Sequence, residues 1–258
     1  MEKELFIKQL RPDVYLLDEA HEVSGYLVVG EDKALVIDTM NGYNDLHKAV
    51  RDITDKPIML VNTHGHPDHI FGNVYFEEAY LNPADYELAE SFTTSDEYKR
   101  MFTDNGLNMP PFKPIRGGDV IDLGGKTLEV YDIPGHTAGS ILLLLKEYRI
   151  LFAGDAINHH LWMMLDGCPP MSELVKTLDG LMFLEDQADV ILHGHARDFD
   201  DISLMRCVRD GAAEICNGET ADDLPYEWFD GVAMQHPFKL IEGKKYSQID
   251  SVICYQPQ

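Results

Sequence analysis

A histidine-rich loop that follows a buried strand constrains this chain more than any other segment. The loop spans residues 63–69 and reads THGHPDH, directly after the apolar run 58–61, which predicts a strand. Imidazole and carboxylate side chains are the ligands that suit zinc, iron or manganese. Such a loop is therefore predicted to bind metal, because chance rarely places so many ligand types together. Its candidate ligands are His64, His66, Asp68 and His69.

Three later positions repeat this setting, each at the end of an apolar strand that a glycine or a turn accompanies. They are His136, Asp155 and His195. Any one of them alone is weak evidence, since a single histidine at a strand end is usually a surface residue. Together with the loop they give five histidines and two aspartates, enough ligands for two metals that share a bridging carboxylate and a hydroxide.

The hydrophobic pattern predicts two strand-rich halves, each trailing helices. In the first half we expect strands over Leu5–Gln9, Val14–Leu17, Val23–Val29, Ala34–Ile37 and Ile58–Val61, helices over Asn44–Ile53 and Asp85–Ala89, and an extended segment over Tyr75–Leu81. In the second half we expect strands over Asp119–Leu123, Thr127–Ile133, Ser140–Leu145, Arg149–Ala153, Val190–His193 and Lys239–Tyr255, and helices over Met171–Leu184, with Ser172 as N-cap, and Asp201–Cys216, ending at Asn217 and Gly218. Two sheets stacked face to face with helices outside would satisfy this pattern. No linker or shift in composition divides the chain, so a single domain over residues 1–258 is expected.

One segment, Ser91–Pro114, departs from this alternation. It is polar and ends in the proline-rich run 109–114. A long insertion without strands is often a lid or a substrate wall. We expect a lid over residues 91–114, with a surface excursion that has no role as the alternative.

Composition narrows the classes of partner. The chain carries 45 acidic and 21 basic residues, for a formal charge of −24. Such a surface repels phosphate backbones and anionic lipids, so neither nucleic acid nor membrane is expected as a partner. A small-molecule substrate fits this charge better. The sequence does not indicate the oligomeric state, so it is compatible with a homo-oligomer as well as with a monomer.

Localisation follows from what the sequence lacks. No run approaches the roughly 18 apolar residues of a membrane helix, and the charged N-terminus has no apolar signal core. The four cysteines form no C-x-x-C pair, which favours free thiols in a reducing compartment. A cytoplasmic protein is expected.

The chain resembles the metallo-β-lactamase superfamily, and in particular its glyoxalase II-like (hydroxyacylglutathione hydrolase-like) hydrolases. The resemblance rests on the loop 63–69 together with the runs GHTAGS (135–140), AGD (153–155) and GH (194–195), in the family's order, and covers roughly residues 10–215. It implies an α+β fold, a four-layer αββα sandwich of two mixed β-sheets flanked by helices. It implies two divalent ions, most commonly Zn²⁺, with Mn²⁺ or Fe as alternatives. By the same resemblance His64, His66 and His136 would bind the first metal, Asp68, His69 and His195 the second, and Asp155 would bridge them.

Two positions leave alternatives open. The family commonly has Pro-Gly-His-Gly at its last ligand, whereas this chain reads HGHA over residues 193–196. The Gly-His pairing favours His195, and His193 would then be a strand-end residue or a partner of a ligand. Asp38 matches a family position close to the metals and would orient a ligand histidine, or it simply caps the turn after its strand.

Mechanism and substrate follow from this reading. Two divalent ions lower the pKa of a bridging water towards neutrality, which makes hydroxide the nucleophile, and Asp68 would be the catalytic group that relays its proton. The segment after Asp155 should line the mouth of the site. His159 and His160 would contact substrate there, Trp162 would form an apolar wall unless it belongs to the core, and Tyr43 is a further candidate.

The leading hypothesis is a metal-dependent hydrolase of a small ester, thioester or lactone. A glutathione thioester is disfavoured because the C-terminal segment has no basic cluster, and a β-lactamase because nothing indicates export. Alternatives are a phosphodiesterase on a small substrate and a non-haem iron dioxygenase or oxidoreductase on the same scaffold. A catalytically silent binding protein would lack ligands, and all seven are present.

Overall fold

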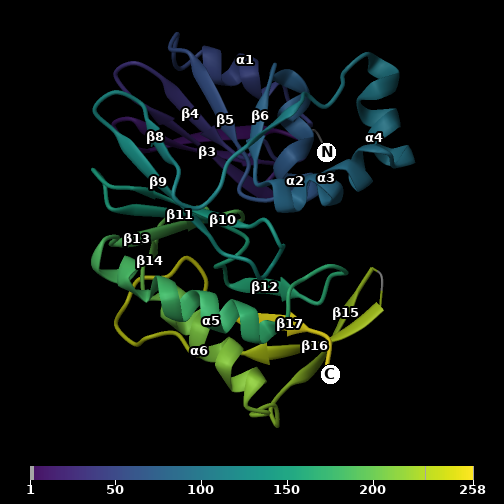
Figure 1. The fold of residues 1–258 in the computed structure, drawn as a ribbon, viewed down its shortest axis with the longest axis vertical. Helices are drawn as coiled ribbons and strands as arrows, with labels where there is room; N and C mark the ends of the chain where they lie inside the picture. Colours follow the sequence, from purple (N-terminus) through teal and green to yellow (C-terminus); the bar gives the residue numbers. More distant parts are fainter. Residues whose placement is uncertain (1–2, 230, 258) are drawn as a thin grey trace. The chain divides into compact units, whose positions relative to one another are not determined.

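The computed structural model describes residues 3–229 and 231–257, and its strands and helices are drawn in Figure 1. The chain forms two compact units, Met1–Tyr131 and Asp132–Gln258, each of which is described by itself. Within the described residues, no helix combines the length and the apolar character needed to cross a membrane.

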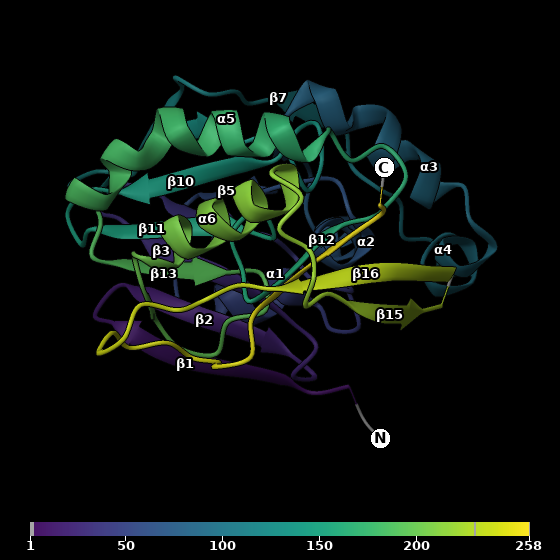
Figure 2. The same cartoon turned by 90° about the horizontal axis from the view of Figure 1, so that it is seen from below.

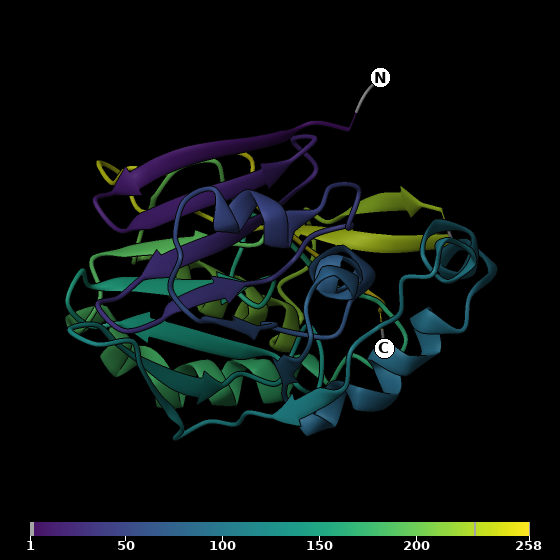
Figure 3. The ribbon, with the colours of Figure 1, turned by 90° about the horizontal axis from the view of Figure 1, so that it is seen from above.

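A seven-stranded sheet is the centre of the first unit, with its strands in chain order from β1 to β7. Short turns join the first four strands, which pair antiparallel, and the purple end of Figure 3 shows this ribbon. Longer connections join the next three strands, which pair parallel. The strands are β1 (Leu5–Arg11), β2 (Val14–Glu19), β3 (Val23–Val29), β4 (Ala34–Ile37), β5 (Ile58–Val61), β6 (Ala79–Leu81) and β7 (Phe112–Pro114). An antiparallel hairpin of β8 (Val120–Asp122) and β9 (Thr127–Asp132) completes the unit.

The helices of the first unit are short. They are α1 (Leu46–Arg51), α2 (Pro67–Ile70), α3 (Tyr86–Thr93) and α4 (Asp96–Met101), with 3₁₀ turns over Phe71–Tyr75, Pro83–Asp85 and Thr103–Asn105. The core on this sheet includes Leu17, Leu27, Val36 and Leu60, all nearly inaccessible to solvent. Burial on both sides explains why β4 reads as a continuous apolar run.

Parallel pairing of β4 with β5 positions the histidine loop. Ile37 and Val61 are partners in the register, so Asp38 and the loop 63–69 leave the sheet at the same edge. Asp38 adopts a left-handed conformation with φ of 60°, which turns the chain sharply there.

Residues 75–114 correct two sequence expectations. Tyr75 ends a 3₁₀ turn rather than starting an extended segment, and β6 begins only at Ala79. The predicted insertion without strands is wrong at its end, because Phe112–Pro114 forms β7 on the edge of the sheet. Aromatic side chains hold residues 91–114 against the rest of the unit, since Tyr98 and Phe102 are buried against Phe71. A lid function for residues 91–114 stays a prediction.

The second unit contains two groups of strands. One follows the order β14-β13-β11-β10 and the other the order β12-β17-β16-β15. The strands are β10 (Ile141–Leu145), β11 (Ile150–Gly154), β12 (His160–Met163), β13 (Val190–His193), β14 (Asp200–Asp201), β15 (Leu224–Trp228), β16 (Gly231–Pro237) and β17 (Val252–Tyr255). Two helices, α5 (Met171–Leu181) and α6 (Leu204–Cys216), lie side by side, as Figure 2 shows. A 3₁₀ turn over Met182–Asp186 follows α5.

Helix ends in this unit differ partly from expectation. The N-cap of α5 is Pro170, so Ser172 lies inside the helix and the predicted cap is wrong. Helix α6 begins at Leu204 because Asp200 and Asp201 pair with β13. Its end at Asn217 is confirmed, with Gly218 in the left-handed conformation that commonly closes a helix.

The C-terminal sheet was the least visible part of the sequence. Of the predicted strand Lys239–Tyr255 only Val252–Tyr255 is strand, and β12, β15 and β16 were not expected. Residues 224–228 read LPYEW, and the proline and the lack of clean alternation do not indicate a strand. The sheet tolerates this sequence because β15 is an edge strand that pairs with β16 on one side only.

Candidate metal centre

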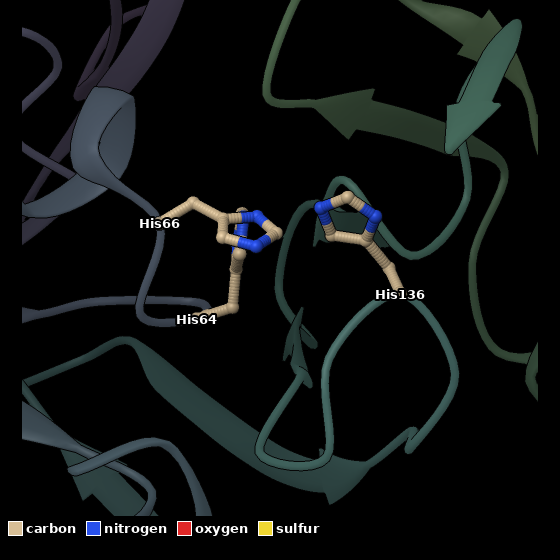
Figure 4. A group of neighbouring side chains, drawn as sticks. All are labelled: His64, His66 and His136. Atoms are coloured by element: carbon tan, nitrogen blue, oxygen red, sulfur yellow. The ribbon is translucent and has the colours of Figure 1, made fainter. Parts of the chain in front are cut away.

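The histidine loop follows β5 and continues into α2, which contains Asp68 and His69. His64 Nε2 and His66 Nδ1 lie 3.1 Å apart, and the stick view in Figure 4 shows both side chains on the same loop. His69 Nε2 lies 3.6 Å from Asp68 Oδ2. The backbone N–H of Gly65 donates to Asp85 Oδ2 at 2.8 Å, which ties the middle of the loop to the start of α3. Both pairs of predicted ligands within the loop are thus brought together.

Asp38 anchors this loop from the adjacent strand. Its Oδ1 accepts the backbone N–H of Thr63 at 2.7 Å, and its Oδ2 accepts the Thr63 hydroxyl at 2.7 Å and lies 2.9 Å from His69 Nδ1. An ionised carboxylate only accepts hydrogen bonds, so the proton of His69 resides on Nδ1. Nε2 of His69 is then the unprotonated nitrogen, which is the form that binds a metal.

The same reasoning fixes the tautomer of His64. Thr63 Oγ1 uses its single proton for Asp38, so it accepts from His64 Nδ1, which lies 3.1 Å away. Nε2 of His64 is therefore unprotonated and faces His66. This pair of ring nitrogens can share one proton or bind one cation between them.

The second unit contributes a matching arrangement. His136 Nδ1 lies 2.7 Å from the carbonyl oxygen of Trp162, and a carbonyl only accepts, so His136 is also protonated at Nδ1. Its Nε2 lies 3.9 Å from Asp155 Oδ2, which in turn lies 3.1 Å from His195 Nε2. Two predicted ligand histidines, His136 and His195, therefore converge on the carboxylate of a third predicted ligand, Asp155.

Strand pairing explains this convergence. Strands β11 and β13 are parallel, with a bulge at which Gly154 pairs with His193. The backbone N–H of Gly194 donates to the carbonyl of Gly154 at 2.8 Å, so Asp155 and His195 leave neighbouring strand ends together. Gly154 has φ of 48°, a conformation that glycine adopts at little cost.

His193 belongs to a different cluster. Its Nδ1 accepts the backbone N–H of His195 at 3.2 Å, and its Nε2 lies 3.2 Å from Asp200 Oδ2. Asp200 Oδ1 lies 3.1 Å from His159 Nε2, and all three side chains are buried. Burial lowers the pKa of the His193 imidazole, although Asp200 acts in the opposite direction. Of the two alternatives for His193, its contacts fit a partner of the ligand loop.

Asp200 joins this cluster to the C-terminal segment. Burial by itself would raise the pKa of Asp200, but hydrogen bonds from His159, His193 and Ser247 hold it well below its usual range. His159 Nδ1 lies 2.8 Å from Ser251 Oγ, so both of its ring nitrogens have partners inside the fold. That leaves His159 no ring nitrogen for a substrate, in contrast to its predicted role.

The remaining substrate candidates are scattered. His160 lies at the start of β12, and burial lowers the pKa of its imidazole, with a further lowering from His195. Trp162 is partly exposed, whereas the neighbouring Met163 and Met164 are buried core residues. Tyr43 is 38% exposed in the first unit, with the Lys3 ammonium 4.5 Å from its ring centroid.

Sequence reasoning missed several residues that hold the ligands. Asp85 and Asp200 lie outside the ligand motifs and act through partners that are distant in the sequence, and Thr63 belongs to the loop motif but its hydrogen bonds to Asp38 were not expected. The aromatic residues Tyr226 and Trp228 of β15 were missed for the same reason.

The donor chemistry fits divalent metals. His64, His69 and His136 each have Nδ1 committed to an acceptor inside the fold, the arrangement in which metal-binding histidines are normally held. Carboxylates at Asp68 and Asp155 add hard oxygen ligands, so the set suits zinc or manganese.

Comparison with known proteins identifies the family. The family model described as "Metallo-beta-lactamase superfamily" matches residues 19–195, which is more than half of the chain. The chain belongs to the metallo-beta-lactamase superfamily. Its fold class is accordingly that of this superfamily, with mixed sheets and helices, as the resemblance predicted.

Relatives and solved structures of this superfamily agree. The acyl-coenzyme A thioesterase MBLAC2 of Gallus gallus is 30% identical over 248 residues, which cover 81% of this chain and 88% of the relative. A hydroxyacylglutathione hydrolase of Hyphomonas neptunium is 32% identical over 135 residues, covering 52% of this chain and 47% of the relative. A metallo-beta-lactamase family protein of Thermus thermophilus has a TM-score of 0.59 at 25% identity, covering 83% of this chain and 81% of that one. A metallo-beta-lactamase from Pontibacter korlensis has a TM-score of 0.61 at 19% identity, covering 79% and 96%.

The glyoxalase II-like resemblance is thus confirmed, and the chain is an enzyme of a superfamily whose named relatives here are hydrolases. Metallo-beta-lactamase superfamily members bind divalent metals, usually zinc, and the histidine and aspartate clusters are consistent with that.

Proposed function

We propose that this chain is a dinuclear metal-dependent thioesterase. The observation that carries the proposal is the fixed tautomer of His64, His69 and His136, each protonated at Nδ1 so that Nε2 can bind a metal. A metal site prepared in this way, in a superfamily hydrolase, supports metal-assisted hydrolysis.

The proposed ligand sets follow the order of the motifs. His64, His66 and His136 would hold one metal, and Asp68, His69, Asp155 and His195 the other. Asp155 is proposed as the bridging group, which is supported by the approach of both His136 and His195 to its Oδ2.

The metals, when bound, would supply a nucleophilic hydroxide near neutral pH and stabilise negative charge on the substrate oxygen. In the net reaction, the oxygen of water joins the carbonyl carbon, the carbon–sulfur bond breaks, and the thiol leaves with a proton. Asp68, 35% exposed in its side chain, would accept the proton that water loses and pass it on. Asp38 and Thr63 keep the ligand histidines in the required tautomer.

The choice of a thioester among the candidate substrates is supported by the relatives. One relative, aligned over 81% of this chain, is named an acyl-coenzyme A thioesterase, and another is named a hydroxyacylglutathione hydrolase. A small oxygen ester or lactone would undergo the same chemistry. A phosphodiester and an oxygenase reaction are therefore outcomes for the test rather than parts of the proposal.

The test combines a substrate panel with variants of two ligands. We expect the purified protein to hydrolyse an acyl thioester faster than a matched oxygen ester, a lactone and a phosphodiester. His66→Ala and Asp68→Ala should each lower kcat by at least about 100-fold with an unchanged circular dichroism spectrum. His21→Ala, an exposed histidine outside the site, is the matched control and should retain activity. Full activity in either site variant would rule the mechanism out.

Elemental analysis of the same preparation tests the metal assignment. Two zinc or manganese ions per chain would support the dinuclear hydrolase. One redox-active iron per chain, with oxygen consumed during turnover, would favour the oxygenase instead.

A further inference from the structure

A cluster of aromatic rings occupies one face of the C-terminal sheet. Trp162 of β12 is its centre, with ring centroids 6.2 Å from Tyr226, 5.9 Å from Trp228 and 6.3 Å from Phe229. Trp228 and Phe229 are also neighbours, at 4.9 Å, and His160 lies 5.2 Å from Tyr226. The aromatic cluster therefore joins a strand that follows Asp155 to a hairpin more than 60 residues later in the chain.

Strand pairing puts these rings on the face opposite to α6. Ile253 of β17 is fully buried and lies close to Gly211 of α6, so the residues on either side of it point the other way. One of those residues, Cys254, is the register partner of Trp162 and packs in the same small core as Tyr226 and Trp228. Helix α6 thus covers one face, and the aromatic cluster forms the other.

The cluster is directly connected to a proposed metal ligand of its own unit. The carbonyl oxygen of Trp162 accepts a hydrogen bond from His136 Nδ1 at 2.7 Å. At its outer end Phe229 is 86% exposed. An apolar surface therefore extends from Trp162, whose carbonyl is hydrogen-bonded to the proposed ligand His136, outwards to solvent.

We propose that the aromatic cluster of Trp162, Tyr226, Trp228 and Phe229 binds the apolar acyl chain of the thioester substrate. This inference rests on the proposed function and adds a substrate class to it, namely thioesters of medium-length or long acyl chains. A large exposed aromatic side chain is costly to leave in water, and a flexible alkyl chain laid across flat rings removes apolar area from water on both sides.

The net charge of the chain favours an uncharged alkyl chain over a membrane surface as the occupant of the aromatic cluster. The chain has a formal charge of −24, which repels anionic lipid headgroups. An uncharged alkyl chain needs no basic residues, and within β12, β15 and β16 the structure describes no lysine or arginine. A second copy of this chain on the same rings is the main competing occupant, and the experiment below identifies it.

The first experiment is an acyl-chain series on one thiol, from acetyl to dodecanoyl coenzyme A. We expect kcat/KM to rise about 3- to 4-fold per methylene until the chain reaches the end of the cluster. Trp228→Ala and Phe229→Ala should each lower the ratio of kcat/KM for decanoyl over acetyl thioester by roughly 10-fold. Phe183→Ala, a 45% exposed phenylalanine outside the cluster, is the matched control and should leave that ratio unchanged.

A binding measurement that needs no turnover completes the test. The chain has only two tryptophans, and both lie in the aromatic cluster, so its tryptophan fluorescence reports on this surface. Titration of the purified protein with decanoate should change the emission, acetate should not, and Phe229→Ala should weaken the decanoate effect.

Distinct outcomes separate this inference from the proposed function. Thioester hydrolysis without chain-length dependence, or with a dependence that Trp228→Ala and Phe229→Ala leave intact, overturns the acyl-chain site and leaves the thioesterase standing. Absence of thioester hydrolysis at every chain length overturns the proposed function itself. Conversion of a dimer to a monomer by Phe229→Ala, with chain-length dependence intact, would show that a second copy covers the cluster.

Discussion

Asp38 determines which ring nitrogen carries the proton in two candidate ligands, His64 and His69. It accepts hydrogen bonds from Thr63 and faces His69 directly, and through the Thr63 hydroxyl it also determines the tautomer of His64. Its left-handed backbone conformation, φ of 60°, makes the choice of substitution important. Asparagine tolerates this conformation and alanine does not, so Asn removes the charge while the turn remains.

Asp38→Asn should lower metal affinity by about 10- to 100-fold, because the ligand histidines lose the acceptor that orients them. Competition with a chromogenic chelator measures this directly. The exposed Asp55→Asn is a control of equal charge change and should bind metal as the unaltered protein does. Unchanged affinity in Asp38→Asn would show that Asp38 only shapes the turn.

At the scale of elements, the position of Asp38 depends on the close approach of the backbone of β3 to the backbone of residues 37–38. A Cβ atom on Gly25 of β3 would sit 2.6 Å from the carbonyl oxygen of Asp38 and 3.1 Å from that of Ile37. Both contacts are with backbone, which cannot move aside as a side-chain end would.

Gly25→Ala should therefore destabilise the fold by about 1–3 kcal/mol through overpacking and weaken metal binding at the same time. Urea unfolding and chelator competition on the same sample test both effects. Gly180→Ala in α5 meets no atom within 4 Å and is the contrasting control. It should stabilise the protein by roughly 0.5–1 kcal/mol, since alanine favours a helix interior over glycine.

The Asp200 cluster connects β14 with the C-terminal segment. Asp200 is fully buried, receives hydrogen bonds from His159 and Ser247, and lies 3.2 Å from His193 Nε2. Asp200→Asn should lower the free energy of unfolding by about 2–4 kcal/mol, because it leaves buried donors without their charged acceptor. Urea unfolding at pH 7 measures the loss, and the exposed Asp222→Asn should show none.

This difference should depend on pH in one direction. The folded protein holds the pKa of Asp200 below its ordinary value, so its contribution is fully present above the unfolded pKa of about 3.9. It is lost as pH falls through the folded pKa. The gap between Asp200→Asn and the unaltered protein should therefore shrink below about pH 4, and a gap that grows there would contradict the assignment.

At the scale of the whole molecule, the expected single domain stays a prediction. The proposed metals would take ligands from both compact units, so they would link the unfolding of one to the other. Calorimetry should then show one transition for the metal-loaded protein, and metal removal with a chelator should lower its midpoint by roughly 5–15 °C. Two transitions of which only one responds to the chelator would contradict shared ligation.

The sequence by itself determined the family and the candidate ligands. Ligand residues at strand ends form local patterns, as in the loop 63–69 and the run 153–155, and the order of such patterns does not depend on how the strands pack. Most strands were predicted for the same local reason, since β4, for example, is an unbroken apolar run bounded by turns.

Only the tertiary structure decided what supports those ligands. Asp38 and His69 are separated by 31 residues, and His159 and Ser251 by 92. Trp162 and Trp228 likewise meet only because their strands, β12 and β15, join the same sheet through β17 and β16. A hydrogen bond or ring contact across such distances depends on strand order and register, and these are set by the packing of the whole chain rather than by any local pattern. The histidine loop therefore predicts a metal, and the aromatic cluster and the Asp200 cluster come from the fold.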